Sequence, residues 1–413
     1  AWSTRMLAAL IKGVQGGRWF SLMDKVYAPE NLAAAWKRVR SNRGAAGVDG
    51  QSVAQFERDA AKHLDTLHRQ LRDGHYRPNA VRRQWIEKPG TTKKRPLGIP
   101  TIRDRIVQSA LRQVLEPIWG AKFADHSYGF RPRRSCKDAL RRVQALLRSG
   151  HVWVVDADIQ SYYDSIDHGR LLAELRREIA DSRVLGLMER LLGQRVMDTG
   201  STWTPEEGIP QGSSLGPLLA NVFLHPIDKL LERGHFEVIR YADDLVIMCR
   251  SRADAQRALR RLRQEIESRG LTLHPEKTRV TSVHEGGFDF LGYHFGRNGR
   301  HPRKQSLVKL KDRVREITKR LNGKSLPAII DQLNGTLRGW FEYFRHSSKR
   351  TFPPLDAWIR MRLRRIEQWR HRKRGNGRGK CHYRWTNEYF ASLGLFTMTT
   401  ARAVASRPPI GDH

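Results

Sequence analysis

Two short stretches of the chain place carboxylates where strands are expected to end. Ala242, Asp243 and Asp244 separate two β-prone runs, residues 236–241 and 245–249, and form the expected turn of a hairpin. Asp156-Ala157-Asp158 lies near the end of a Val-rich run, residues 151–159, which reads as a buried strand. The sequence therefore predicts two acidic strand ends in two separated segments.

These acids have the right type and spacing to hold cations. Two adjacent carboxylates in one turn repel each other, and a cation bound between them relieves the repulsion. If the two strands are neighbours, Asp158 and Asp243 converge on a pair of hard cations, the usual machinery of phosphoryl transfer. Asp156 and Asp158 share a strand face, so spacing alone leaves the choice between them open. The alternative is a solvated acidic turn.

The charge balance points to an anionic partner. The 413 residues include 76 Lys and Arg against 42 Asp and Glu, a formal net charge of +34. Such an excess repels itself in a compact chain unless a polyanion neutralises it. The basic residues are spread along the whole chain, which favours nucleic acid over a membrane surface. A basic protein without such a partner is the alternative.

Composition argues against several other classes. Apolar residues make up 39 % of the chain, too many for a disordered protein. No run approaches the ~20 apolar residues of a membrane span, and we expect no signal peptide. The three cysteines form no CxxC pair and no zinc cluster, so we expect a cytoplasmic protein.

Mixed elements are expected before residue 300 and helices after it. Residues 17–75 read as short helices, and residues 81–88 and 95–101 as extended segments joined by a turn. Residues 279–295 form another strand region, and residues 371–380 a basic, Gly-containing run. Apolar spacing predicts longer helices over residues 106–118, 135–147, 253–268, 307–321, 326–344 and 355–370.

The order of these segments resembles a known family, the reverse transcriptases and maturases encoded by bacterial group II introns. The likeness covers about residues 20 to 390, and the ordered series of motifs is far more specific than any single one. The matching segments are Gly47-Val48-Asp49-Gly50, Lys88 with residues 95–100 and Asp104-Arg105, residues 127–132, 158–164, 208–212 with Pro217 and Asn221, 241–244, 273–278, 290–293 and 339–343.

The resemblance implies a right-hand polymerase fold of the α/β (α+β) class. Fingers and palm with an antiparallel sheet would be followed by an α-helical thumb or maturase (X) domain. The implied ranges are residues 1–80 for an N-terminal extension and the start of the fingers, 81–300 for fingers and palm, 301–390 for the thumb/maturase domain and 391–413 for a C-terminal tail. The likeness includes no endonuclease domain.

The implied activity is RNA-directed DNA synthesis. It would use deoxynucleoside triphosphates, a DNA or RNA primer, an RNA template such as the intron itself, and two Mg²⁺ ions, with Mn²⁺ as a substitute. The resemblance makes Asp158, Asp243 and Asp244 the catalytic metal ligands, joined by the backbone carbonyl of Ile159. Asp158 is chosen over Asp156 because the family places an aromatic residue five positions later, here a tyrosine.

That tyrosine, Tyr163, would lie under the sugar of the incoming nucleotide and exclude a 2′-hydroxyl; ordinary core packing is the alternative. Lys88 and Arg95 would hold the triphosphate, although Lys93 and Lys94 compete with Lys88 for this role. The residues assigned to nucleotide binding are Lys88, Arg95, Tyr163, Gln211 and Lys277, and those assigned to primer and template are Arg131, Gly292 and Tyr293.

Three rival functions share some of these features. An RNA-dependent RNA polymerase has the same metal-binding palm, but Tyr163 argues against it. An RNA chaperone or maturase without polymerase activity explains the charge but not the acids. A reverse transcriptase recruited by its host for DNA repair or phage defence carries the same motifs.

Overall fold

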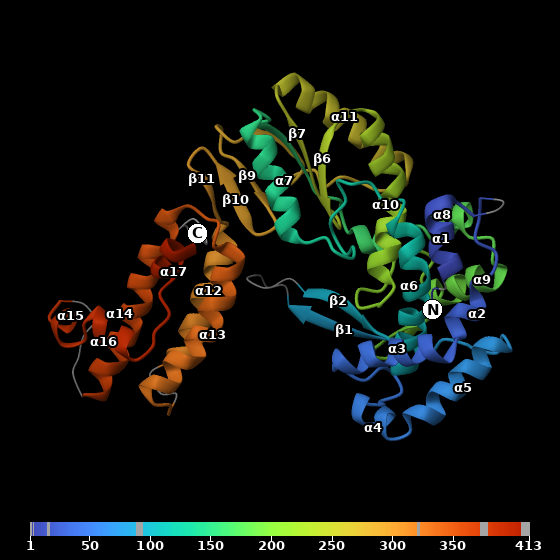
Figure 1. Cartoon of the computed structure of the whole chain (residues 1–413), viewed down its shortest axis with the longest axis horizontal. Coiled ribbons are helices and arrows are strands. Elements are labelled where there is room, and N and C mark those ends of the chain that lie inside the picture. Colours follow the sequence, from blue (N-terminus) through green and yellow to red (C-terminus); the bar gives the residue numbers. More distant parts are fainter. Residues whose placement is uncertain are drawn as a thin grey trace, which may run out of the picture. The chain divides into compact units, whose positions relative to one another are not determined.

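The protein is described by a computed structural model that covers residues 2, 4–14, 17–87, 94–319, 323–371 and 379–405. The chain divides into two compact units, Ala1–Thr281 and Ser282–His413 (Figure 1). Each unit has its own hydrophobic core. The unit boundary comes after Thr281, whereas the sequence changes character near residue 300; the ranges expected for fingers, palm and thumb remain predictions.

Helix α6 (Ile102–Gly120) forms the centre of the first core. Its Ile106, Val107, Leu111 and Val114 are fully buried, and Thr101 caps its first turn by accepting a hydrogen bond from the backbone of Asp104. Helices α2 and α3 pack against it. The remaining helices of this unit are α1 (Thr4–Lys12), α2 (Met23–Tyr27), α3 (Pro29–Ser41), α4 (Val53–Arg58), α5 (Ala60–Arg72), α7 (Cys136–Arg148), the 3-10 helix η1 (Tyr162–Ser165), α8 (His168–Glu178), α9 (Ser182–Leu192), α10 (Gly216–Arg233) and α11 (Arg252–Ser268).

The sheet that carries the acids has the strand order β6-β7-β3-β8. Strands β6 and β7 form an antiparallel hairpin, and β7 also pairs antiparallel with β3. The valine and isoleucine side chains on both faces of these strands are buried. Helix α11 packs on β3 and β7 (Figure 1). The bounds are β3 (Trp153–Ala157), β6 (Glu237–Tyr241), β7 (Asp244–Cys249) and β8 (Arg279–Ser282).

The outer edge of β6 is covered by a loop rather than by another strand. Ser127 forms a parallel bridge with Arg240. The backbone N–H of Tyr128 donates to the carbonyl of Arg240 at 2.8 Å, and the N–H of Arg240 donates to the carbonyl of His126 at 2.9 Å. Residues 126–128 therefore lie directly against the strand that leads into the acidic turn.

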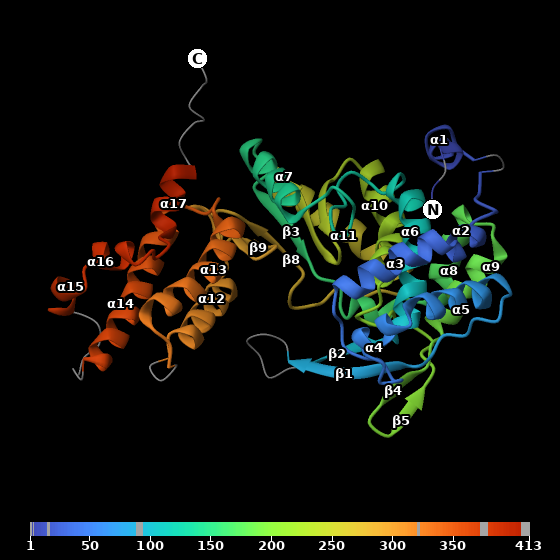
Figure 2. The same cartoon turned by 60° about the horizontal axis from the view of Figure 1, so that its bottom comes forward.

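A second sheet has the order β2-β1-β4-β5. The antiparallel pair β1 (Val81–Glu87) and β2 (Lys94–Ile99) was predicted as two extended segments. The β4–β5 hairpin, formed by Val196–Asp198 and Ser201–Trp203, was not predicted, because strands of three residues give too little alternation to detect. Figure 2 shows this hairpin at the edge of the first unit.

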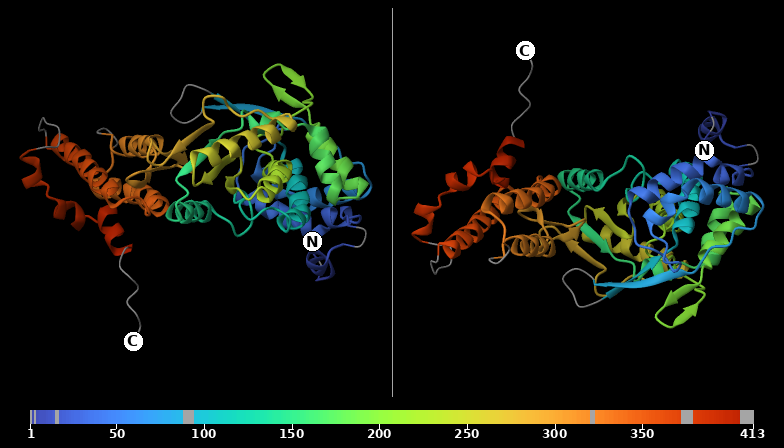
Figure 3. Two further views of the ribbon diagram at one scale, coloured as in Figure 1. Left: turned by 90° about the horizontal axis from the view of Figure 1, so that it is seen from above. Right: turned by 90° about the horizontal axis from the view of Figure 1, so that it is seen from below.

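The second unit combines a small sheet, of order β11-β10-β9, with helices. Helices α12, α13 and α14 supply most of its buried side chains, and α12 packs along α13 (Figure 3). The bounds are β9 (Phe288–Phe290), β10 (Tyr293–Gly296), β11 (Gly299–Pro302), α12 (Lys304–Ile317), α13 (Leu326–Phe344), the 3-10 helix η2 (Lys349–Thr351), α14 (Phe352–Arg370), α15 (Cys381–Arg384), α16 (Asn387–Ser392) and α17 (Met398–Ala405).

The predicted fold class is confirmed: antiparallel sheets and helices come first, and a mainly helical region follows. The segment expected as a C-terminal tail contains α17, whose Met398 is fully buried in the second core. Most of the basic run expected at residues 371–380 lies outside the described residues. Within the described part of the chain, none of the helices has the length and apolar character needed to cross a membrane.

Candidate active site

The acidic turn is the shortest possible link between β6 and β7. Tyr241 pairs with Asp244, so only Ala242 and Asp243 lie between the strands. Ala242 has a φ of +60°, a left-handed conformation typical of two-residue hairpins but costing a non-glycine residue about 1–2 kcal/mol. The backbone of the turn is therefore held in one defined shape.

Strand β3 brings the second acid to the same place. Its last pair with β7 joins Ala157 to Leu245, and Asp158 follows immediately. The carbonyl of Asp158 accepts a hydrogen bond from the N–H of His274 at 2.8 Å, and Ile159 bridges to Leu273. These backbone contacts fix the strand end beside the turn.

The carboxylates of Asp158 and Asp243 are close enough to influence each other electrostatically. Burial raises the pKa of Asp243, and the nearby carboxylate of Asp158 raises it further, while Arg240 and Lys277 act in the opposite direction. The Asp158 carboxylate accepts a hydrogen bond from Lys277 Nζ at 2.8 Å. The Asp244 side chain is exposed. Asp156, the alternative to Asp158, lies 3.7 Å from Arg279 Nε.

The donor set suits a hard cation. Two negatively charged carboxylates repel each other, and a divalent ion between them stabilises the pair. Oxygen is the ligand that Mg²⁺ prefers. Among the described residues, no group of three His, Cys, Asp or Glu side chains is already placed to hold a metal ion. The pair Asp158 and Asp243 therefore fits a cation site in chemistry, and Asp244 stands next to it on β7.

Tyr163 lies close to these acids. It belongs to η1, is half-buried, and its carbonyl accepts a hydrogen bond from the N–H of Ile209 at 2.7 Å. Burial, followed by the charge of Asp243, raises the pKa of Tyr163 to about 12. The ring is therefore a neutral, partly packed surface close to the acidic turn.

Gln211 lies in a loop that also touches β2. Its carbonyl accepts a hydrogen bond from the N–H of Gly98 at 2.7 Å. With Gly98, Pro210 and Asp164 it lines a cavity of about 330 Å³ between this loop and the second sheet. Gln211 and Tyr163 are thus linked through the segment that contains residues 208–211.

Of the three other residues predicted to bind the nucleotide, the structure describes Arg95 and Lys277. Arg95 is exposed on β2, opposite Ile86 on β1. Lys277 is exposed and contacts Asp158 as described above. Lys88 lies outside the described residues.

The predicted primer and template residues make internal contacts. The Arg131 guanidinium donates to the carbonyls of Gly120, Ala124 and Ser127 at 2.7–3.0 Å. Tyr293 is buried in the second unit, and its hydroxyl donates to the carbonyl of Tyr343 at 2.6 Å. Their contact with nucleic acid stays a prediction.

Gly292, the remaining residue of this group, has a φ of +81°. Its carbonyl accepts hydrogen bonds from the N–H of Arg303 at 2.9 Å and from Ser306 Oγ at 3.0 Å. It therefore forms the turn that leads from β9 into β10, ahead of Tyr293.

Sequence reasoning missed two buried residues next to the turn, Arg240 and Asp228. Arg240 immediately precedes Tyr241 and pairs with Asp228 on α10. An arginine inside the apolar run of β6 was the available signal, because a charge in a buried strand requires a partner.

Comparison with known proteins decides the family. Residues 86–295 match the family described as reverse transcriptase (RNA-dependent DNA polymerase). Residues 307–385 match the group II intron, maturase-specific domain. The chain belongs to the reverse transcriptases of the group II intron type. The predicted family and enzyme class are thereby confirmed, and enzymes of this family generally use divalent metals.

Several proteins are similar to this reverse transcriptase, and some of them are named as intron proteins. Protein YkfC of Escherichia coli K12 is 34 % identical over 313 residues, which cover 66 % of this chain and 82 % of YkfC. The group II intron-encoded protein LtrA of Lactococcus lactis subsp. cremoris is 36 % identical over 49 % of this chain and 34 % of LtrA. The putative COX1/OXI3 intron 1 protein of Saccharomyces cerevisiae is 27 % identical over 74 % of this chain and 41 % of its own length.

The reverse transcriptase thus spans well under half of the last two relatives. Among solved structures, a chain of the partial Cas6-RT-Cas1--Cas2 complex matches with a TM-score of 0.39 and 26 % identity, over 60 % of this chain and 42 % of that one.

Proposed function

We propose that this reverse transcriptase copies RNA into DNA with two Mg²⁺ ions, for which Mn²⁺ substitutes, held by Asp158, Asp243, Asp244 and the carbonyl of Ile159. The observation that carries the proposal is the pairing of β3 with β7, which sets Asp158 beside Asp243. Divalent ions held by these residues would supply two effects: a lowered pKa of the primer 3′-hydroxyl and neutralisation of charge on the triphosphate and the leaving pyrophosphate.

The chain's own residues orient the nucleotide. Tyr163, held half-buried beside Asp243, presents its ring to the sugar and leaves no room for a 2′-hydroxyl. Gln211 contacts sugar or base from its loop, Arg95 binds the triphosphate from β2, and Lys88, which lies outside the described residues, binds the same triphosphate. Lys277, whose ammonium already lies at a carboxylate of the site, approaches the same phosphates.

The ranges of the right hand belong to the same proposal. Residues 1–80 are an N-terminal extension and the start of the fingers, 81–300 fingers and palm, 301–390 the thumb/maturase domain and 391–413 a tail. Arg131, Gly292 and Tyr293 contribute to primer and template binding. The partners are an intron RNA template, a DNA or RNA primer and deoxynucleoside triphosphates. We place the activity in the cytoplasm, which the free thiols of Cys136, Cys249 and Cys381 support.

Primer extension tests the proposal. Asp243→Ala should lower DNA synthesis on an RNA template at least ~100-fold, because losing a metal ligand removes several kcal/mol of transition-state stabilisation. RNA affinity, measured by filter binding, should stay within about twofold, since a carboxylate contributes nothing to phosphate binding. Asp65→Ala, which removes an exposed acid on α5, is the matched control and should leave synthesis unchanged.

The same assay separates the rivals. Extension with ribonucleotides alone would identify an RNA polymerase. RNA binding by wild-type protein without any synthesis would leave a chaperone or maturase. A splicing assay with the flanking intron distinguishes the intron role, supported by the match of residues 307–385, from a role in DNA repair or phage defence.

A further inference from the structure

We propose that Arg240 is a positioning residue that fixes the shape of the turn carrying Asp243, an inference that rests on the proposed function. Arg240 is the last residue but one of β6, and its side chain is 1 % exposed. It points away from solvent, so it touches neither RNA nor nucleotide. Its effect on the reaction must pass through the groups that it contacts.

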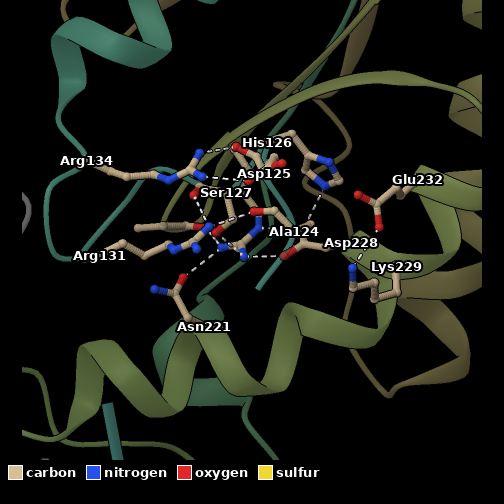
Figure 4. Close-up of polar contacts among 12 residues, drawn as sticks. Ala124, Asp125, His126, Ser127, Arg131, Arg134, Asn221, Asp228, Lys229 and Glu232 are labelled. Atoms are coloured by element: carbon tan, nitrogen blue, oxygen red, sulfur yellow. Dashed lines mark hydrogen bonds and ion pairs between the residues drawn. The ribbon is translucent and has the colours of Figure 1, made fainter. Parts of the chain in front are cut away.

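The guanidinium joins three segments that are distant in sequence. It pairs with both carboxylate oxygens of Asp228 on α10, with Nε at 2.8 Å from Oδ1. It also donates to Asn221 Oδ1 at 2.9 Å and to Ser127 Oγ at 2.8 Å. Figure 4 shows Ser127, Asn221 and Asp228 converging from the loop and from α10.

A further hydrogen bond of the guanidinium reaches the turn that carries Asp243. Arg240 Nη1 donates to the carbonyl of Ala242 at 2.8 Å. Ala242 is the residue in the left-handed conformation, and a fixed partner for its carbonyl holds the peptide that connects it to Asp243. The direction of the Asp243 carboxylate therefore depends on the guanidinium.

The loop at residues 127–130 is held by the same network. Asn221 Nδ2 donates to the carbonyl of Gly129 at 2.8 Å, while its Oδ1 accepts from Arg240. The backbone of Gly129 in turn lies against the turn, since a Cβ built there would be 2.3 Å from the nitrogen of Ala242. The turn is thus enclosed between the guanidinium on one side and a backbone on the other.

If Arg240 only neutralised the charge of Asp228, the double variant would behave differently from what a positioning role predicts. If Arg240 served only to neutralise Asp228, removing both charges together would restore the protein, because neither buried charge would be left unpaired. If it positions the turn, the double variant Arg240→Met/Asp228→Asn regains stability but not catalysis. The comparison separates folding from positioning.

The experiment measures two properties of the full chain. One is steady-state DNA synthesis on an RNA template with a DNA primer, and the other is thermal unfolding. We expect Arg240→Met/Asp228→Asn to lower kcat about 100-fold, the cost of a displacement near 1 Å at reacting groups. KM for the nucleotide and the affinity for RNA should change by no more than about twofold. Arg240→Lys, which keeps the charge opposite Asp228 but cannot reach all four partners, should lower kcat at least about tenfold.

Glu237→Gln is the matched control. It removes an ion pair with Arg142 (2.5 Å) at the opposite end of the same strand and should leave kcat unchanged. A folded double variant, or a folded Arg240→Lys variant, with the kcat of the wild type would overturn the positioning role while the proposed function stands. Absence of synthesis by the wild type would instead overturn the proposed function and this inference with it.

Discussion

At the scale of single residues, the site combines two carboxylates in unlike surroundings. Asp243 is half-buried, and burial raises its pKa, whereas Asp158 is one-third exposed and paired with Lys277. Repulsion from Asp158 contributes to the raised pKa of Asp243, and a cation bound between the two carboxylates would relieve that repulsion.

Tyr163 offers a prediction about sugar selection. Tyr163→Val should raise kcat/KM for ribonucleotides relative to deoxynucleotides by at least about tenfold, because the ring no longer fills the space of a 2′-hydroxyl. Competition between the two nucleotide sets in one primer extension measures the ratio. Tyr162→Phe is the control, since its hydroxyl donates to the carbonyl of Ala220 in the core and has no part in the sugar site. Unchanged discrimination in Tyr163→Val would place the selective group elsewhere.

Asp228 gives a prediction about pH. Burial alone would raise its pKa, but the charge and hydrogen bonds of Arg240, together with those of His126, outweigh burial, and the pKa falls to about 2. Because this folded-state pKa lies below the ordinary value, the carboxylate stabilises the fold above pH ~4, and the contribution is lost as the pH falls toward 2.

Asp228→Asn should therefore lower the free energy of unfolding by about 3–5 kcal/mol at pH ~7, since it leaves Arg240 buried and unpaired. The difference from the wild type should shrink below pH ~4. Urea unfolding across this range provides the measurement. A difference that is independent of pH would contradict the assigned shift.

At the scale of elements, a loop packs against the acidic turn that we propose to be catalytic. Gly129→Ala should lower kcat at least about tenfold, because the added Cβ would overlap the backbone at Tyr241 and Ala242 and push turn and loop apart. Gly120→Ala at the end of α6 meets no atom within 4 Å and serves as the control. Primer extension compares the two; equal rates would show that the loop yields without disturbing the turn.

Most elements that position the site were predictable from local pattern. The Val-rich strand, the hairpin and the helix at residues 106–118 all have a clear apolar period, and each is present in the structure. Contacts between distant segments were not predictable in this way. The bonds from Arg240 to Asp228 and Ser127 join residues 12 and 113 positions apart, and no local spacing reports them. Tyr293 illustrates the same limit, because its burial against Tyr343 depends on α13.

At the scale of the whole molecule, the net charge of +34 governs association with RNA. Binding should release about 0.7 to 0.9 counterions per phosphate neutralised, so the dissociation constant should rise steeply with salt. Filter binding between about 50 and 200 mM KCl should show a loss of affinity of about 10³-fold or more if six or more phosphates are contacted. A flat response would contradict binding along the phosphate backbone.

The covering of β6 by residues 126–128 has a consequence for the behaviour of the chain in the cell. An uncovered edge strand offers unpaired N–H and C=O groups that recruit strands from other molecules. Here the Ser127–Arg240 bridge occupies that edge. Variants that loosen this loop should therefore form intermolecular β-sheet aggregates during synthesis, which would lower the yield of folded protein in addition to any effect on catalysis.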